Sequence, residues 1–158
     1  MTVSTVGVLK SMQRMSEEMP YVNLAFSLHA PNQEVRLKIV PAASAHHLDK
    51  LMVAVDTHIT ANRKSYMDRK AIRRNGVKPS DDEVDAAIKR SAGLRPNKIT
   101  GVMIEYILIK DVNDRPEHAE ELGRLLSSRR DHIILNLIPY NPTDVAEEFY
   151  PPTEESVE

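Results

Sequence analysis

Polar side chains follow several apolar runs of this sequence, and these are the residues that could bind a polar ligand. Ser27, Leu28 and His29 come at the end of the apolar stretch that begins at Val22. A hydroxyl and an imidazole there could hold a carboxylate, an amine or a ribose. The alternative is structural, with Ser27 capping the following turn and His29 packing against Pro31.

Ser4 and Asn141 are two further candidates for ligand contact. Ser4 lies in the first apolar run, where its alternative role is a hydrogen bond to neighbouring strand residues. Asn141 lies between Pro139 and Pro142, whose rings restrict the backbone and could pre-position the Asn141 amide. An asparagine that only forms a turn is the alternative.

Four apolar runs of strand length must position these side chains. They cover Thr2–Val8, Val22–Phe26, Gly101–Ile109 and Ile133–Ile138. The last three end in polar residues, and helical patterns follow the first three. Parallel strands deliver the residues at their carboxyl ends to a single edge. The pattern therefore predicts an α/β fold with four parallel strands.

Helical spacing of apolar residues predicts the connecting helices. The predicted helices run from Val8 to Met19, from Gln33 to Ile39, from His46 to Ile59 and from Pro116 to Ser127. A further helix is expected to begin after Ser80, because Glu83 follows at capping-box spacing and Val84, Ala87 and Ile88 form an apolar face. Gly93 and Pro96 are expected to end it.

Residues 62–98 differ in character and are interpreted as an insertion. Their amino-terminal part is rich in basic side chains, which suggest RNA phosphates as a ligand. Tyr66 is the sole aromatic there, so base stacking has little support, and a solvated helix face is the alternative. The candidate RNA-binding residues are Arg63, Lys64, Arg69, Lys70, Arg73 and Arg74.

Other polar residues are interpreted as structural. Glu105 interrupts an apolar run. Because burying an unpaired carboxylate is costly, its side chain should either have a hydrogen-bonding or charged partner or face the lumen of the barrel. Asn113 and Asp114 are expected to organise a turn and cap the next helix. The three histidines His46, His47 and His58 lack metal-ligand spacing and are expected at the surface, and no metal site is predicted.

Composition limits the possible functions. The net charge of −2 gives no general case for a polyanion partner, and no apolar run is long enough to span a bilayer. The first residues lack signal-peptide features, so we expect a cytoplasmic protein, or an organellar one if an upstream transit peptide is missing. The chain has no cysteine, so it supplies no thiolate for an iron–sulfur cluster.

Four motifs together resemble one known family. They are S-T-V-G at Ser4–Gly7, S-L-H-A-P-N at Ser27–Asn32, E-Y-I-L-I-K-D-V-N-D at Glu105–Asp114 and N-L-I-P-Y-N-P at Asn136–Pro142. Their order and spacing resemble the RlmN/Cfr branch of the radical-SAM RNA methyltransferases, which methylate adenine carbons in ribosomal and transfer RNA. The resemblance covers the carboxyl-side half of that family's catalytic domain.

The resemblance implies S-adenosylmethionine as cofactor, with contacts from Ser4, Ser27, Leu28, His29 and Asn141. It also implies a 4Fe-4S cluster and a methyl-carrying cysteine, for which this chain has no residues. The family's chemistry adds a methylene group to C2 of adenine in RlmN-like members and to C8 in Cfr-like members. A missing amino-side half of the barrel, with rRNA and tRNA, would be the partners.

The expected fold is half of a six-stranded partial (βα) barrel over residues 1–142, with an acidic, disordered tail at 143–158. We expect a fragment of a methyltransferase that is inactive alone, because it starts within a strand and lacks the cysteines. The alternative is a non-catalytic remnant that binds RNA or protein. The strand edges at either side of the sheet would promote self-association.

Overall fold

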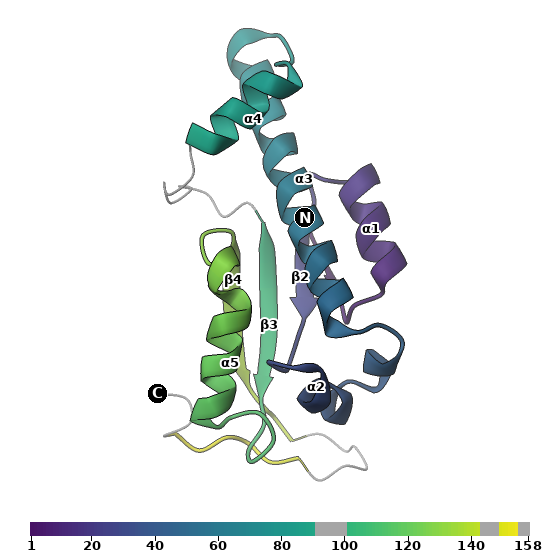
Figure 1. Cartoon of the computed structure of the whole chain (residues 1–158), viewed down its shortest axis with the longest axis vertical. Coiled ribbons are helices and arrows are strands. Elements are labelled where there is room, and N and C mark those ends of the chain that lie inside the picture. The colour runs from purple at the N-terminus through teal and green to yellow at the C-terminus, as the bar shows by residue number, and fades with distance from the viewer. Residues whose placement is uncertain (91–100, 143–148, 155–158) are drawn as a thin grey trace.

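A computed structural model describes residues 1–90, 101–142 and 149–154, and its centre is a sheet of four parallel strands (Figure 1). The order is β1-β2-β3-β4, and each neighbouring pair is parallel. The predicted four-stranded parallel sheet is therefore confirmed. The strands are β1 (Thr2–Thr5), β2 (Asn23–Ser27), β3 (Val102–Leu108) and β4 (Ile133–Pro139).

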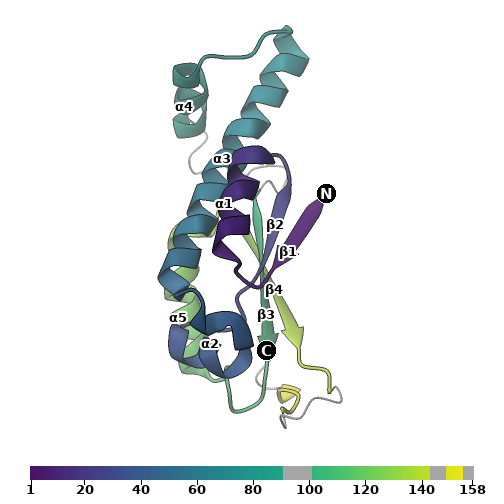
Figure 2. The same ribbon diagram turned by 90° about the vertical axis from the view of Figure 1, so that its right-hand side faces the viewer.

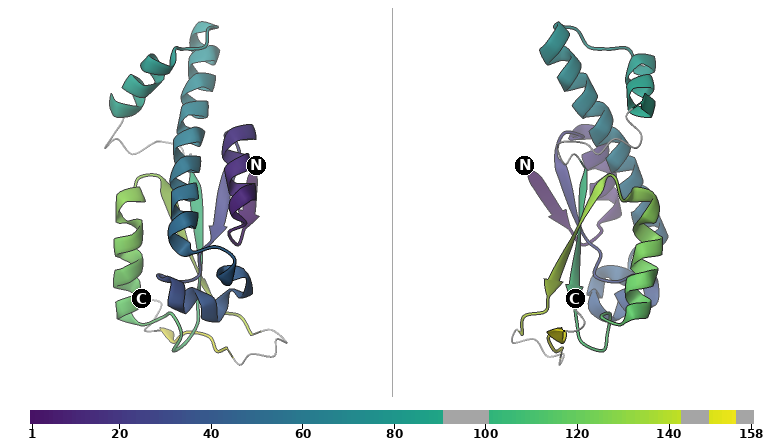
Figure 3. Two further views of the ribbon diagram at one scale, coloured as in Figure 1. Left: turned by 45° about the vertical axis from the view of Figure 1, so that its right-hand side comes forward. Right: turned by 90° about the vertical axis from the view of Figure 1, so that its left-hand side faces the viewer.

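Helices connect the strands and lie over one face of the sheet. The α-helices are α1 (Leu9–Glu18), α2 (Gln33–Ile39), α3 (Leu48–Asn75), α4 (Asp81–Arg90) and α5 (Pro116–Leu126), with short 3-10 helices at Pro41–Ser44 and Ser127–Arg129. Figures 2 and 3 show α1, α3 and α5 on the same side of the strands, and none of the helices in the described residues lies over the other face. This one-sided arrangement is that of a partial barrel.

The hydrophobic core lies between the sheet and these helices. Alternate residues of β2 and β3 point into it, including Leu24, Phe26, Ile104 and Tyr106, which are all at most 1% exposed. Helices α1 and α3 contribute the opposing apolar side chains, among them Met12, Leu51 and Val55. Because side chains of a strand alternate between faces, Ala25, Ser27 and Glu105 point to the helix-free side.

The first strand is shorter than predicted, and the reason is a glycine turn. The apolar run suggested a strand from Thr2 to Val8, but β1 ends at Thr5. Gly7 has a φ of +102°, and a Cβ added there would lie 2.8 Å from Leu51 Cδ1. Only glycine combines this backbone conformation with such a close approach, so the chain turns here toward α1.

Side-chain caps start α2 and α4, and His47 Nδ1 accepts a longer hydrogen bond of 3.4 Å from the Asp49 amide at the start of α3. Asn32 Oδ1 accepts a hydrogen bond of 2.9 Å from the Val35 amide at the start of α2. Before α4, the Ser80 amide donates to Glu83 Oε2 at 2.9 Å and the Glu83 amide donates to Ser80 Oγ at 3.3 Å. This reciprocal pair confirms the predicted capping box. The expected end of this helix at Gly93 and Pro96 lies outside the described residues.

Helix α3 is much longer than the sequence pattern indicated. The apolar periodicity predicted an end near Ile59, whereas the helix continues to Asn75 and ends at Gly76 in the left-handed conformation. None of the last 13 residues of α3 is buried. This part of the helix therefore needs no apolar stripe, and the apolar periodicity used for the prediction does not extend into it. Helix α4 folds back against α3, where Lys64 Nζ lies 2.8 Å from Asp81 Oδ1 and Val84 is buried.

His58 corrects a prediction. Sequence reasoning placed it at the surface, but its side chain is fully buried between α3 and α1. His58 Nε2 lies 2.9 Å from the Val22 carbonyl oxygen, and Nδ1 lies 3.2 Å from Ser16 Oγ. These partners come from segments far apart in the sequence, which a single-sequence pattern does not reveal. Within the described residues, no helix is long and apolar enough to cross a membrane.

Candidate functional site

Two of the predicted site residues meet at one carboxylate on the helix-free face. Ser27 Oγ donates a hydrogen bond of 2.9 Å to Glu105 Oε2, and Ser4 Oγ lies 3.5 Å from the same oxygen. These residues come from β2, β3 and β1. A carboxylate accepts up to about four hydrogen bonds, so Glu105 keeps acceptor capacity for a ligand.

Strand register extends this cluster to β4. Ser27 pairs with Glu105 in the β2–β3 register, and Glu105 pairs with Asn136 in the β3–β4 register. Side chains in register share a face, so the three form a polar row across the helix-free face. Around the row lie smaller or apolar side chains such as Ala25 and Ile107. Ser27 is the last residue of β2, whereas Glu105 and Asn136 lie in the middle of β3 and β4. The row thus adjoins the carboxyl end of β2, and (βα) barrels place their active sites at the carboxyl ends of their strands.

His29 follows β2 by two residues and has an unusual backbone conformation. Its φ is +58°, in the left-handed region that few residues other than glycine adopt. The amides of Leu28 and His29 both donate to the Glu105 carbonyl oxygen, at 3.0 Å and 3.2 Å. The imidazole then turns back, and its Nδ1 accepts a hydrogen bond of 3.2 Å from the Ile107 amide. The His29 ring thus accepts the hydrogen bond from the Ile107 amide that a backbone carbonyl oxygen of a neighbouring strand would otherwise accept.

The hydrogen bond to Nδ1 decides the protonation state of His29. Since an amide can only donate, Nδ1 must be the unprotonated nitrogen, and the neutral ring carries its proton on Nε2. Burial lowers the pKa of His29, the nearby Arg36 guanidinium adds to that effect, and the Glu105 carboxylate opposes it. At neutral pH, His29 therefore presents an Nε2–H donor.

Asn113 holds the loop around His29. Its Nδ2 donates to the carbonyl oxygens of His29 at 2.8 Å and Ile107 at 2.6 Å, and its Oδ1 accepts from the Ile109 amide at 2.7 Å. Asn113 is only 1% exposed. Its expected turn-organising role is therefore confirmed. The expected helix cap is wrong, because α5 begins after Arg115 without a side-chain cap.

Arg36 connects the segments that carry Ser4 and Ser27. It lies on α2, is 1% exposed, and its Nη2 donates a hydrogen bond of 2.6 Å to the Val6 carbonyl oxygen. Its guanidinium lies over the Phe26 ring, 5.7 Å from the centroid. This contact fixes the turn after Ser4 against the strand that carries Ser27.

The other predicted site residues are placed less tightly. Leu28 is fully buried, so its side chain is not accessible to a ligand. Asn141 is exposed and follows β4 by two residues, at the same edge of the sheet as His29. It makes no described contact with the Ser4, Ser27 and Glu105 cluster.

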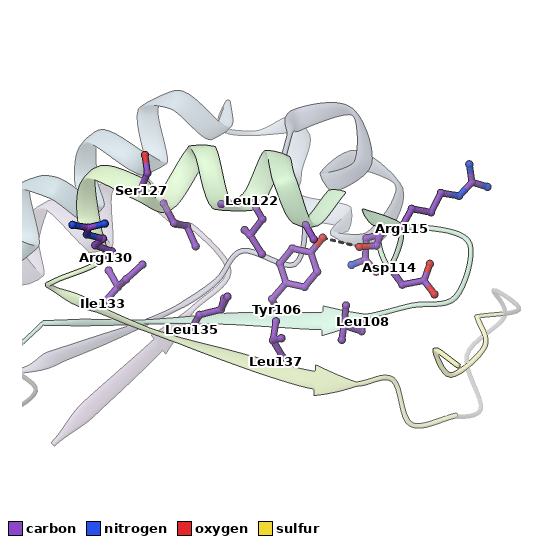
Figure 4. A pocket seen from close by; sticks show the side chains of 14 residues that line it. Tyr106, Leu108, Asp114, Arg115, Leu122, Ser127, Arg130, Ile133, Leu135 and Leu137 are labelled. Carbon is purple, nitrogen blue, oxygen red and sulfur yellow. Dashed lines mark hydrogen bonds between the residues drawn. The ribbon is translucent and has the colours of Figure 1, made fainter. Parts of the chain in front are cut away.

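A separate groove lies on the helix side of the sheet. It has a volume of about 620 Å³ between α5 and the strands β3 and β4, and Figure 4 shows Tyr106, Leu122 and Leu137 along it. Tyr106 donates from its hydroxyl to the Asn113 carbonyl oxygen at 3.0 Å. The lining is mostly apolar and contains no residue predicted to contact the cofactor, so the groove is distinct from the polar cluster.

The implied cofactors fit this chain to different degrees. Hydroxyl, carboxylate and imidazole groups near Ser27 suit the amine and ribose of S-adenosylmethionine. The iron–sulfur cluster does not fit, because the chain contains no cysteine. Among the described residues, no group of three or more His, Cys, Asp or Glu side chains could hold a metal ion.

Comparisons with known proteins agree with this geometry. No family model matches the sequence. A solved radical SAM methyltransferase from Sphaerobacter thermophilus superimposes with a TM-score of 0.67 at 31% identity, over 99% of this chain and 34% of its own. A probable dual-specificity RNA methyltransferase RlmN from Enterococcus faecalis is 33% identical over 156 residues, which are 99% of this chain and 34% of the relative.

A second curated relative is the ribosomal RNA large subunit methyltransferase Cfr of Staphylococcus aureus, also 33% identical, over 95% of this chain and 34% of its own length. The parallel sheet with one helix-covered face is thus part of a radical SAM methyltransferase barrel. Within that class, the chain is similar over nearly its whole length to the RNA methyltransferases RlmN and Cfr. It spans about a third of the length of the curated relatives it matches.

Proposed function

We propose that this chain is part of a methyltransferase that modifies C2 of adenine in ribosomal and transfer RNA. Its own contribution is to bind S-adenosylmethionine through Ser4, Ser27, Leu28, His29 and Asn141, with Glu105 as an additional contact. The observation that carries the proposal is the convergence of the Ser4 and Ser27 hydroxyls on Glu105, next to an imidazole held as an Nε2–H donor.

Each group has a role that follows from its chemistry. Glu105, held in place by Ser27, accepts hydrogen bonds from the cofactor's ammonium or ribose hydroxyl groups. His29 donates from Nε2, and the amide of Asn141 can donate or accept. When bound, S-adenosylmethionine supplies the methyl group and the radical chemistry, while this chain orients it. Residues outside this chain must hold the cluster and the methyl-carrying cysteine.

Direct binding of S-adenosylmethionine to the chain tests the proposal. We expect isothermal titration calorimetry to show weak binding, which His29→Ala and Ser27→Ala each reduce roughly two- to tenfold, as a lost hydrogen bond of about 0.5–1.5 kcal/mol requires. Ser44→Ala, at an exposed position of the Pro41–Ser44 helix, is the matched control. Absence of binding by the wild-type chain, or equal binding by all variants, would contradict the proposal.

The target carbon needs a separate measurement. The chain would be combined with the cysteine-bearing remainder of the enzyme, and the modified adenine identified by mass spectrometry. The proposal of C2 follows the resemblance to RlmN-like members, whose name two of the relatives carry. A C8 product would exclude that assignment. RNA binding without any cofactor binding would instead favour the non-catalytic remnant.

A further inference from the structure

The carboxyl-terminal half of α3 and the helix α4 form an arm that extends away from the sheet. Asn62 is the last buried residue of α3, and the helix continues to Asn75. With a rise of 1.5 Å per residue, Lys70 and Arg74 lie roughly 12 and 18 Å beyond Asn62 along the helix. Figure 1 shows this arm above the sheet, with α4 packed against α3.

The arm is basic although the whole chain is slightly acidic. Residues 62–90 contain nine Lys or Arg and five Asp or Glu, whereas the full chain has a net charge of −2. Positive charge is thus concentrated on one projecting element. Such local concentration is the electrostatic pattern by which proteins attract nucleic-acid phosphates.

Half of the six candidate RNA-binding residues already have partners within the chain. Arg63 Nη1 lies 3.1 Å from His132 Nε2, Lys64 is paired with Asp81, and Arg69 lies over the Tyr21 ring, 5.9 Å from its centroid. These three side chains hold the arm together or fix it to the body. They are therefore less available to a ligand than the sequence alone suggested.

The other three form an exposed basic surface. Lys70, Arg73 and Arg74 are exposed, and within the described part of the chain no carboxylate forms an ion pair with any of them. Their spacing of three and four residues places them on one side of α3. The name basic tip is used below for these three residues.

The basic tip lies far from the cofactor site. Helix α3 starts beside the carboxyl ends of the strands and runs back past their amino ends (Figure 1). Its 28 residues span about 42 Å. Ser27 is the last residue of β2, so the helix runs away from the cluster toward the opposite end of the sheet, and the basic tip does not reach a nucleotide bound beside Ser27.

We propose that the basic tip binds the phosphate backbone of the RNA substrate, at a distance from the modified base. Contacts to phosphates position a nucleic acid without reading its sequence, which suits a basic surface without stacking aromatics. The choice of RNA over other polyanions rests on the proposed function, whereas the presence of a polyanion site rests on the charges alone. The arm thus provides a second anchor for the substrate.

The test compares two triple variants that remove equal charge. Lys70→Ala/Arg73→Ala/Arg74→Ala removes the basic tip, and Lys10→Ala/Lys38→Ala/Lys50→Ala removes three exposed lysines from the body. Binding to a fluorescein-labelled RNA hairpin is measured by anisotropy as a function of salt, without S-adenosylmethionine. Circular dichroism checks that both variants fold, as expected for exposed sites.

We expect the basic-tip variant to bind the hairpin ten- to a hundredfold more weakly at low salt, with a salt dependence reduced by about two in log–log slope, as three lost phosphate contacts predict. The control should bind like the wild type. Equal binding by both variants, or no binding by the wild type, would overturn the proposal. It would also be overturned if poly-glutamate competed as well as unlabelled RNA, because the partner would then be an acidic protein.

The outcome is independent of the cofactor experiment. A chain that binds RNA through the basic tip but does not bind S-adenosylmethionine would overturn the proposed function and leave the polyanion site intact. A chain that binds the cofactor but not the hairpin would do the reverse.

Discussion

At the scale of single residues, His29 combines a side chain that can bind a ligand with a strained backbone conformation. His29 adopts a left-handed conformation, and three hydrogen bonds maintain it, from its own amide, its carbonyl oxygen and its ring. Such conformations cost of order 1–3 kcal/mol and tend to occur at functional sites. The buried Asn113 holds His29 by donating a hydrogen bond to its carbonyl oxygen. Asn113 also bonds to the Ile107 carbonyl oxygen and the Ile109 amide at the end of β3.

Buried histidines make the stability of the chain pH-dependent. Burial lowers the pKa of His58 below its ordinary value, and the hydrogen bond with the Val22 carbonyl oxygen only partly offsets this. As pH falls below about 6.5, the unfolded state binds a proton that folded His58 resists, so stability is complete above this pH and declines below it. Burial lowers the pKa of His29 and His132 as well, and both add to the decline.

Urea unfolding at several pH values measures this effect. We expect His58→Gln to lower the free energy of unfolding at pH 7.5 by about 1–3 kcal/mol, because buried hydrogen-bond partners are left unsatisfied. The same variant should lose less stability than the wild type between pH 7 and pH 5. An identical pH dependence in both proteins would show that His58 does not titrate as argued.

The sequence predicted some site residues and not their arrangement. Ser4, Ser27 and His29 could be proposed because each follows or interrupts an apolar run and matches a family motif. Glu105 was recognised only as a residue in need of a partner, and Asn136 was not singled out. Both interrupt apolar strands, but whether they share a face with Ser27 depends on strand register, which is set by long-range pairing.

At the scale of elements, the turn after β1 couples the site to the helices. Gly7 lies against Leu51 of α3, and Arg36 of α2 holds the neighbouring Val6 carbonyl oxygen. The position of Ser4 thus depends on contacts from two helices. The apolar run predicted a strand through this turn, and the buried arginine could not be anticipated from a short helical pattern.

Two glycine-to-alanine substitutions should change the free energy of unfolding in opposite directions, one in this turn and one inside a helix. Gly7→Ala should lower the free energy of unfolding by about 2 kcal/mol or more, because the new methyl group would contact Leu51 and the φ of +102° strains an alanine. Gly123→Ala lies in α5 with open space around it, and should raise stability by up to about 1 kcal/mol. Chemical denaturation checks both, and equal effects of the two changes would contradict the account of the turn.

At the scale of the whole molecule, each outer strand has one edge that pairs with no other strand of the described residues. β1 and β4 are the ends of the sheet order, and Leu135 and Leu137 of β4 are 39% and 46% exposed. The predicted sheet and helices follow from local apolar patterns, which is why they were largely correct. The continuation of α3 into the arm was not predicted. Its polar part is stabilised by the Gly76 cap and by the contact of Lys64 with Asp81 of α4, and neither produces an apolar periodicity in the sequence.

Exposed strand edges should make the isolated chain self-associate. We expect multi-angle light scattering to show dimers or larger species at high protein concentration, because free edges and apolar side chains favour pairing between copies. Leu137→Lys should shift the population toward monomer by placing a charge on the outer strand. A monodisperse wild-type monomer at the same concentration would contradict this expectation.

The proposed function requires S-adenosylmethionine to bind on the helix-free face, next to Ser27, Glu105 and His29. An NMR titration of the ¹⁵N-labelled chain with S-adenosylmethionine tests this placement most directly. We expect chemical-shift changes concentrated at the amides of Ser4, Ser27, His29 and Glu105. Changes confined to the groove beneath α5, around Leu122 and Leu137, or no changes at all, would contradict it.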